Sequence, residues 1–219
     1  MSLERLPSCS GHYIHCMDEP GTAVGHGTWL LTLSDTRSDA PWEAEGAELV
    51  LWLEVVEHHG VLDPDWREVA LYRTDGTVSP PSHDGHWVVQ AEAMALPPLT
   101  SPTPFKGPDN RFMVQLCQVP DPDLVNEWMS EAKKVTLDVP FRRELWAEVG
   151  SVLPESADRG WGEIHVTRVG DWVALDRIFT NETWLEGQAL LDKVVGASYR
   201  MVCRPLMDTS EGDRPFDGA

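Results

Sequence analysis

The sequence has few basic residues. It contains 17 Lys and Arg against 36 Asp and Glu, a formal net charge of -19. The deficit is largest in residues 1–96, which hold 16 acids and only 4 Lys or Arg. Nucleic acids and anionic membrane surfaces are bound mainly through Lys and Arg. We therefore expect neither of them as a partner, and the acidic surface instead favours a protein with a basic surface.

Long apolar runs and frequent cysteines are also lacking. The longest apolar run, Leu49–Leu53, is too short to span a bilayer, and the first residues lack the apolar stretch of a signal peptide. Four cysteines are too few for a disulfide scaffold. We expect a cytoplasmic protein, in the host cell if the source is viral.

Common catalytic motifs are missing as well. The sequence has no Gly-rich phosphate loop, no nucleophile elbow and no dinucleotide fingerprint. It does have 42% hydrophobic residues and ten tryptophans, enough for a core and for an interface rich in tryptophan. The leading hypothesis is a non-catalytic acidic binding protein, such as an inhibitor, an immunity protein, or an accessory or viral structural protein. The sequence leans against an enzyme without excluding one.

The clearest boundary is a proline-rich segment at residues 97–108, with five prolines in twelve residues. Proline interrupts both helices and central strands, so this segment is predicted to be a linker or a surface strap. It would separate a β-rich acidic lobe at 1–96 from an α+β lobe at 109–206. Residues 207–219 are predicted to form a disordered tail.

The second lobe shows a recognisable order of elements. We expect strands at 110–119, 163–169, 172–178 and 197–206, and helices at 120–134, 140–150 and 181–196. The two middle strands would turn at Gly170–Asp171. This β-α-β-β-α-β order with one extra short helix predicts a ferredoxin-like lobe in a two-lobed α+β protein with a mainly antiparallel sheet.

The first lobe is less regular. Strands are expected at 27–34, 67–73 and 86–96, whereas 43–60 fits either a buried strand or a capped helix. Three segments begin with glycine, a spacer and tryptophan, at Gly27, Gly85 and Gly170, and we interpret them as strand starts. The alternative that the first lobe duplicates the second stays open.

Seven of the eight histidines lie in the first lobe. Four residues of types that bind zinc lie close together near the N-terminus: Cys9, His12, His15 and Cys16. Zinc is therefore a candidate cofactor, although structural zinc sites normally use two separated ligand pairs. A second group comprises His58–His59, Asp63–Asp65 and His83–His86, where Asp84–Gly85 is equally typical of a turn between strands.

One pattern favours an enzyme. The segment His165-Val166-Thr167-Arg168 resembles the His-x-Thr-x element of the two-histidine phosphoesterases, and His26-Gly27-Thr28-Trp29 offers a second copy. The resemblance implies that His26 and His165 exchange protons with a 2′,3′-cyclic phosphate. It also implies that the hydroxyls of Thr28 and Thr167 hold the phosphate.

Overall fold

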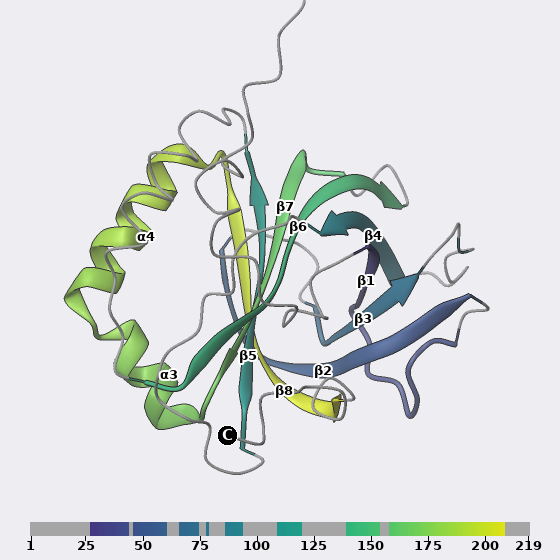
Figure 1. The fold of residues 1–219 in the computed structure, drawn as a ribbon, viewed down its shortest axis with the longest axis horizontal. Coiled ribbons are helices and arrows are strands. Elements are labelled where there is room, and N and C mark those ends of the chain that lie inside the picture. Colours follow the sequence, from purple (N-terminus) through teal and green to yellow (C-terminus); the bar gives the residue numbers. More distant parts are fainter. Residues whose placement is uncertain are drawn as a thin grey trace, which may run out of the picture.

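Eight antiparallel strands close into one barrel. In a computed structural model of the chain, the structure describes residues 27–43, 46–60, 66–74, 78, 86–93, 109–119, 139–153 and 158–208. The strand order around the barrel is β1-β3-β2-β8-β5-β7-β6-β4, and β4 pairs with β1 to close it (Figure 1). The strands are β1 (Thr28–Ser34), β2 (Ala47–Gly60), β3 (Glu68–Thr74), β4 (His86–Ala93), β5 (Arg111–Gln118), β6 (Phe141–Leu153), β7 (Trp161–Val169) and β8 (Ser198–Asp208).

Two helices follow β7 and lie along one side of the barrel, outside β5 and β8 (Figure 1). They are α3 (Trp172–Phe179) and α4 (Glu182–Val194). Within the described segments, no helix has the length and apolarity needed to span a membrane.

The predicted two-lobed α+β fold with a ferredoxin-like C-terminal lobe is wrong. The strands of the two halves pair with each other, β2 with β8 and β4 with β6, so the halves form one closed barrel instead of separate lobes. A strand edge with unpaired backbone groups favours pairing with another edge, and closure removes all of them. The expected linker at 97–108 and residues 209–219 lie outside the described residues, whereas Met207 and Asp208 belong to β8.

Most of the predicted strands are confirmed, and the ambiguous segment 43–60 forms β2. The predicted helix at 140–150 is wrong, because this segment is β6 and pairs with both β4 and β7. Its residues favour a helix locally, but inward Leu145 and Ala147 alternate with outward Trp146, which suits a strand in a barrel. Of the expected glycine-tryptophan strand starts, those at Gly27 and Gly85 are confirmed.

The predicted strand at 172–178 is also wrong. The Gly170–Asp171 pair does not make a hairpin turn, because the Asp171 side chain accepts a hydrogen bond from Ala174 N and caps α3. The predicted helix at 181–196 is confirmed as α4, which Asn181 caps through Trp184 N. The expected helix at 120–134 lies outside the described residues.

Apolar side chains fill the barrel. An eight-stranded barrel is just wide enough for its inward side chains to fill. Trp29, Trp66 and Phe112 are among the largest fully buried side chains. The core also contains Leu31, Leu33, Leu51, Leu53, Val69, Leu71, Val89, Val114, Leu116, Leu145, Ile164, Val166, Tyr199 and Met201.

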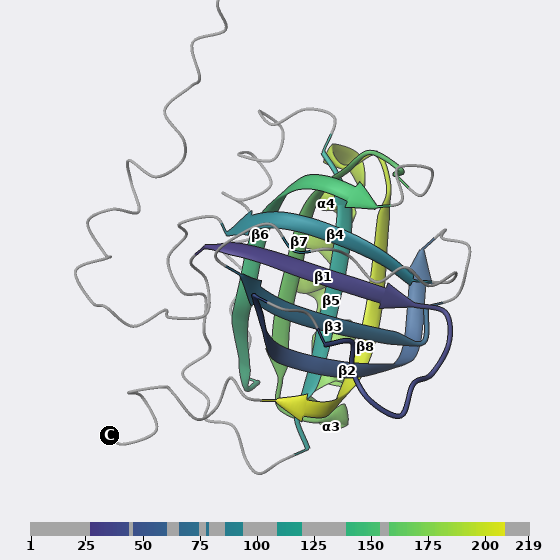
Figure 2. The ribbon, with the colours of Figure 1, turned by 90° about the vertical axis from the view of Figure 1, so that its right-hand side faces the viewer.

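The two halves of the barrel repeat the same plan. The first half is ordered β4-β1-β3-β2 and the second β8-β5-β7-β6, so each arranges its fourth, first, third and second strand side by side. Figure 2 shows the first half in front and the strands of the second half behind it. The two junctions also correspond, because each joins a second strand to the other half's fourth strand.

The register repeats as well. In β2 the pairing is interrupted at Val50 and Val56, and in β6 it is interrupted at Glu144 and Gly150, with the same spacing. When these interruptions are superposed, Trp52 corresponds to Trp146 and, through the strand pairing, Glu68 corresponds to Glu163. In both halves the tryptophan Nε1 donates to the glutamate Oε2, at 3.5 Å and 2.9 Å. The two halves are therefore structural repeats of each other.

The halves differ in their connections. The first and second strands are joined by 12 residues in the first half and 22 in the second, and the third and fourth strands by 11 and 28. The longest of these connections carries α3 and α4. Helices therefore cover the outside of the second half, while the corresponding surface of the first half packs against Trp42 and Val78.

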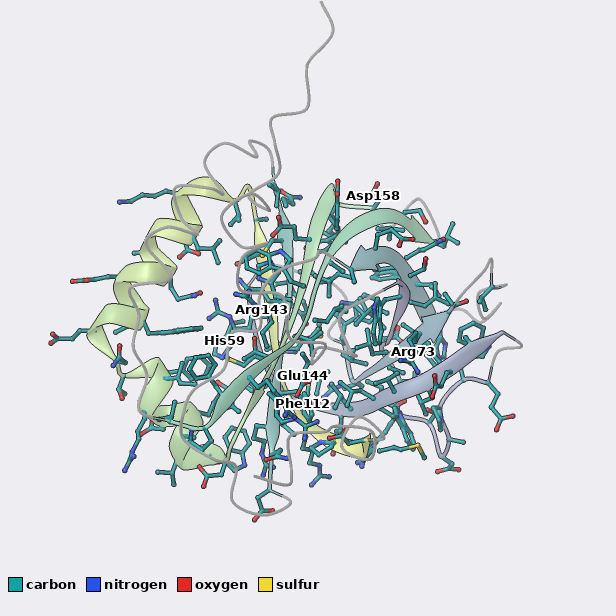
Figure 3. The ribbon with its side chains drawn as sticks, viewed as in Figure 1. His59, Arg73, Phe112, Arg143, Glu144 and Asp158 are labelled. Atoms are coloured by element: carbon teal, nitrogen blue, oxygen red, sulfur yellow. The ribbon has the colours of Figure 1, made fainter. Side chains whose placement is uncertain are left out.

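A buried arginine ties the end of the second half together. Arg168 is fully buried, and its Nε and Nη2 lie 2.6 Å from Glu144 Oε1 and 2.7 Å from Asp208 Oδ2. Its guanidinium lies 4.9 Å from the ring centre of Phe112, and Figure 3 labels Phe112 and Glu144 close together. These contacts join β5, β6, β7 and β8.

Removal of this arginine should be costly. We expect Arg168→Met to lower the free energy of unfolding by about 2–4 kcal/mol, because the buried Glu144 carboxylate then keeps only Arg142 as an ion-pair partner. The double variant Arg168→Met/Glu144→Leu should recover part of the loss. Arg204 of β8 forms an ion pair with Glu54 of β2 at the surface. The control Arg204→Gln removes this pair and should cost less than about 1 kcal/mol. Urea unfolding tests this, and similar losses in Arg168→Met and Arg204→Gln would contradict it.

Candidate functional site

The helices α3 and α4 cover the outer face of the sheet β8-β5-β7-β6. The contact is apolar at the α3 end, where Ala174, Leu175 and Ile178 pack on the strands. The residues that receive them are Met113, Val139, Phe141, Val169 and Val202. This cluster fixes the helices against the barrel.

Polar side chains occupy the next row of the same face. In the register of the sheet, Arg200 of β8 lies opposite Gln115 of β5, which lies opposite His165 of β7. His165 in turn lies opposite Trp146 of β6, so the row crosses all four strands. On the far side of β8, His59 of β2 pairs with Arg200 and contacts Phe179 of α3, with ring centres 6.1 Å apart. From α4, Gln188 accepts a hydrogen bond from Arg200 Nη2. The row therefore lies between the sheet and the helices.

Glu163 positions the histidine of this row. Its Oε2 lies 2.8 Å from His165 Nε2 and accepts a hydrogen bond of 2.9 Å from Trp146 Nε1. An ionised carboxylate only accepts hydrogen bonds, so Nε2 of His165 is the donor in the bond to Glu163. The indole also packs against the imidazole, with ring centres 4.2 Å apart. A carboxylate and a histidine arranged in this way can transfer protons.

Two arginines flank His165 on this face. The guanidinium of Arg143 lies over the Trp146 ring, 4.4 Å from its centre, and Arg200 lies on the opposite side beyond Gln115. Burial lowers the pKa of Arg143 to about 10, against the effect of the Glu163 charge. Burial also lowers the pKa of Arg200, against the effects of Cys117 and Asp192. Both cations are thus partly withdrawn from water.

Neither arginine has a carboxylate partner within ion-pair distance among the described residues. The arginines that do pair with carboxylates are Arg37, Arg73, Arg142, Arg168 and Arg204. Arg143 and Arg200 are therefore available to a negatively charged ligand.

Gln115 supplies a third donor. Its side chain is only 9% exposed, and its buried Nε2 has no hydrogen-bond partner. A buried donor without a partner costs about 1–3 kcal/mol, and a water or a ligand that accepts a hydrogen bond from this Nε2 would remove that cost. Because Gln115 stands between Arg200 and His165 in the register, its amide can bind the same ligand as they do.

The first half of the barrel shows that the fold does not require this polar row. Superposition of the strand registers places Val88, Thr32 and Ala70 where the second half has Arg200, Gln115 and His165. There Glu68, the counterpart of Glu163, accepts hydrogen bonds from Ser38 N at 2.8 Å and Ser38 Oγ at 2.6 Å. The same glutamate thus fixes a loop in one half and a histidine in the other.

The site residues expected from the sequence are only partly described. His165 and Thr167 both lie on the outer face of β7. Thr28 begins β1, donates to Glu92 and is separated from β7 by β4 and β6, so the structure does not bring the two threonines together. His26 lies outside the described residues, and its pairing with His165 stays a prediction.

The proposed zinc ligands Cys9, His12, His15 and Cys16 also lie outside the described residues. Within the described segments, no group of three or more His, Cys, Asp or Glu side chains could hold a metal ion. His58 and His59 lie on β2 and His86 begins β4, whereas His83, Asp63 and Asp65 lie outside the described residues. Zinc binding stays a prediction.

Sequence reasoning missed Glu163, Gln115, Trp146, Arg143 and Arg200. The spacing of Glu163 and His165, two residues apart in a predicted strand, already placed them on one face. The other three strands carried no such signal, because their residues meet only through the register of the sheet.

Comparisons with known proteins leave the family of the chain open. No family model matches the sequence, and no curated protein matches it. Among solved structures, the chain is similar to a "putative monooxygenase from Lactobacillus acidophilus NCFM" at 12% sequence identity and a TM-score of 0.41. The match covers 81% of this chain and 93% of that one, and at this level of similarity it carries no argument about function.

Loss of the Glu163 carboxylate should destabilise this face. We expect Glu163→Gln to lower the free energy of unfolding by about 1–2 kcal/mol, because Trp146 Nε1 and His165 Nε2 lose a shared charged acceptor. Glu148→Gln on the neighbouring strand β6 is the control, since Glu148 is exposed, and it should change stability by less than about 0.5 kcal/mol. Equal effects of the two substitutions in urea unfolding would refute this role.

Proposed function

We propose that the protein binds a small anionic molecule between α4 and the outer face of β8-β5-β7-β6. His165 serves there as a proton acceptor or donor held by Glu163. Arg200 and Gln115 donate hydrogen bonds to the ligand, and α4 covers it. The function is therefore small-molecule binding, with proton transfer as the chemistry that the site can perform.

The comparison of the two halves carries this proposal. At the corresponding positions of the first half the barrel has the uncharged residues Val88, Thr32 and Ala70. Val88 and Ala70 belong to an apolar cluster, and the Thr32 hydroxyl lies 3.5 Å from Ala70 O. Packing alone therefore does not account for an arginine, an amide and a histidine in the second half. Buried polar groups cost free energy unless they are paired, and a ligand that pairs with them supports their presence.

The donors favour an anion over a neutral ligand. A guanidinium binds carboxylate or phosphate oxygens through parallel hydrogen bonds, which are about twice as strong as neutral ones. In a protein of net charge -19, the acidic surface repels anions at long range, so binding depends on these local donors. Association of the ligand should therefore be slow, and the affinity moderate.

Two hypotheses from the sequence stay predictions beside this one. Binding of a basic macromolecule through the acidic surface is supported only by the charge of the chain. It predicts a basic partner that is recovered by affinity capture and released by salt. The two-histidine phosphoesterase hypothesis requires His26 close to His165, and hydrolysis of a cyclic phosphate that is lost when either histidine is replaced by alanine.

The anion site can be tested by titration calorimetry with acetate, benzoate, inorganic phosphate and sulfate. We expect at least one of these to bind the wild-type protein. Arg200→Gln should weaken binding by about 10-fold to 100-fold, the value of a charged hydrogen bond. Arg204 lies on β8, four residues beyond Arg200, and is exposed. Arg204→Gln should therefore leave the affinity within about twofold. Absence of binding by all four anions, or equal affinity in Arg200→Gln and wild type, would overturn the proposal.

A further inference from the structure

Positive charge lies on both sides of His165, not on one. Arg200 stands two strands away across β5, which places its Cα about 10 Å from that of His165. Arg143 comes from β6 on the other side, and its strand partner is Thr167, two residues from His165. Its Cα is therefore a diagonal neighbour of the His165 Cα, at roughly 7 Å. In the strand register, His165 therefore stands between Arg200 and Arg143.

Both cations face the helices. Arg143 and His59, labelled in Figure 3, lie on the side of the strands that faces α3 and α4. Arg143 and Glu144 adjoin the interruption in the β6–β7 pairing, and Glu144 turns inward to Arg168 while Arg143 turns outward to Trp146. The interruption thus places Arg143 on the same face as the polar row.

The first half of the barrel has apolar residues at the positions that correspond to Arg143 and Arg200. The residue of the first half that corresponds to Arg143 is Leu49, and the one that corresponds to Arg200 is Val88. Both belong to the apolar surface that packs against Trp42 and Val78. Apolar residues therefore satisfy the fold at both positions, and the second half has a cation at each.

We propose that the ligand of this site is a dianion, with one anionic group bound by Arg200 and Gln115 and the other by Arg143. The atoms between the two groups then lie along the strand row that contains His165. This assignment rests on the proposed anion site and specifies the substrate class. A ligand with a single charge would leave one buried guanidinium without a counter-charge. The lowered pKa of Arg143, caused by burial, agrees with a cation that gains from an added anion.

Matched mono- and dicarboxylates test the assignment on the full-length protein. The probes are malonate, succinate, glutarate and adipate, each compared by calorimetry with the monocarboxylate of the same chain length. In the wild-type protein we expect one dicarboxylate to bind at least 10-fold more tightly than its monocarboxylate. Arg143→Gln should reduce this preference to about twofold or less, chiefly by weakening the binding of the dicarboxylate. Arg143→Lys should keep part of the preference, and Arg177→Gln on the exposed side of α3 should keep all of it.

The outcomes separate the two proposals. Monocarboxylate binding that depends on Arg200, without any preference for dicarboxylates, overturns the dianion while the anion site stands. A preference that persists unchanged in Arg143→Gln also overturns the dianion. Absence of binding by every probe overturns the anion site, and the dianion with it. The melting temperature of Arg143→Gln, compared with that of Arg177→Gln, shows whether the variant is folded under the conditions of the titration.

Discussion

Backbone pairing at the two junctions between the halves is the constraint on which the rest of the structure depends. Each half is a four-stranded sheet whose outer strands would otherwise expose unpaired N–H and C=O groups. The junctions β2–β8 and β4–β6 pair these strands along most of their length. Closure then forces alternate side chains inward, where they fill the barrel, and sends the remaining side chains to the outer surface. The long strands β2 and β6 meet both demands through their paired interruptions, which bend them around the barrel.

The polar residues of the candidate site lie on the outer face of the barrel. The barrel holds large side chains such as Trp29, Trp66 and Phe112, and the polar row stands on its outer face. In the second half the 28-residue connection between β7 and β8 provides a cover with α3 and α4. In the first half the 11-residue connection contains no described helix, and apolar residues line the surface. The outer face of the first half is thus an apolar cluster, whereas the outer face of the second half carries the polar row.

The sequence predicted individual strands better than their assembly. Alternation of apolar residues was clear in β1, β3, β4, β5 and β8, whereas β6 was mistaken for a helix because residues such as Glu144, Leu145 and Glu148 favour one locally. The start of α3 was mistaken for a turn because aspartate after glycine suits both a hairpin and an N-cap. In the sequence, the three segments with glycine, a spacer and tryptophan were the only sign that the first half repeats the second. Trp52 and Trp146, with Glu68 and Glu163, show the repeat more clearly, but connections of different length hide their common spacing.

The sequence by itself determined the acidic character of the chain, the positions of most strands, the capped helix α4 and the common face of Glu163 and His165. These properties depend on composition and on neighbours a few residues apart, which a linear reading contains. Only the tertiary structure decided that the halves close into one barrel, and that Arg143, Gln115, Trp146 and Arg200 meet at His165. The physical reason is that strand order and register are set by pairing between segments far apart in the chain. A shift of one residue in any strand would turn its member of the polar row into the core.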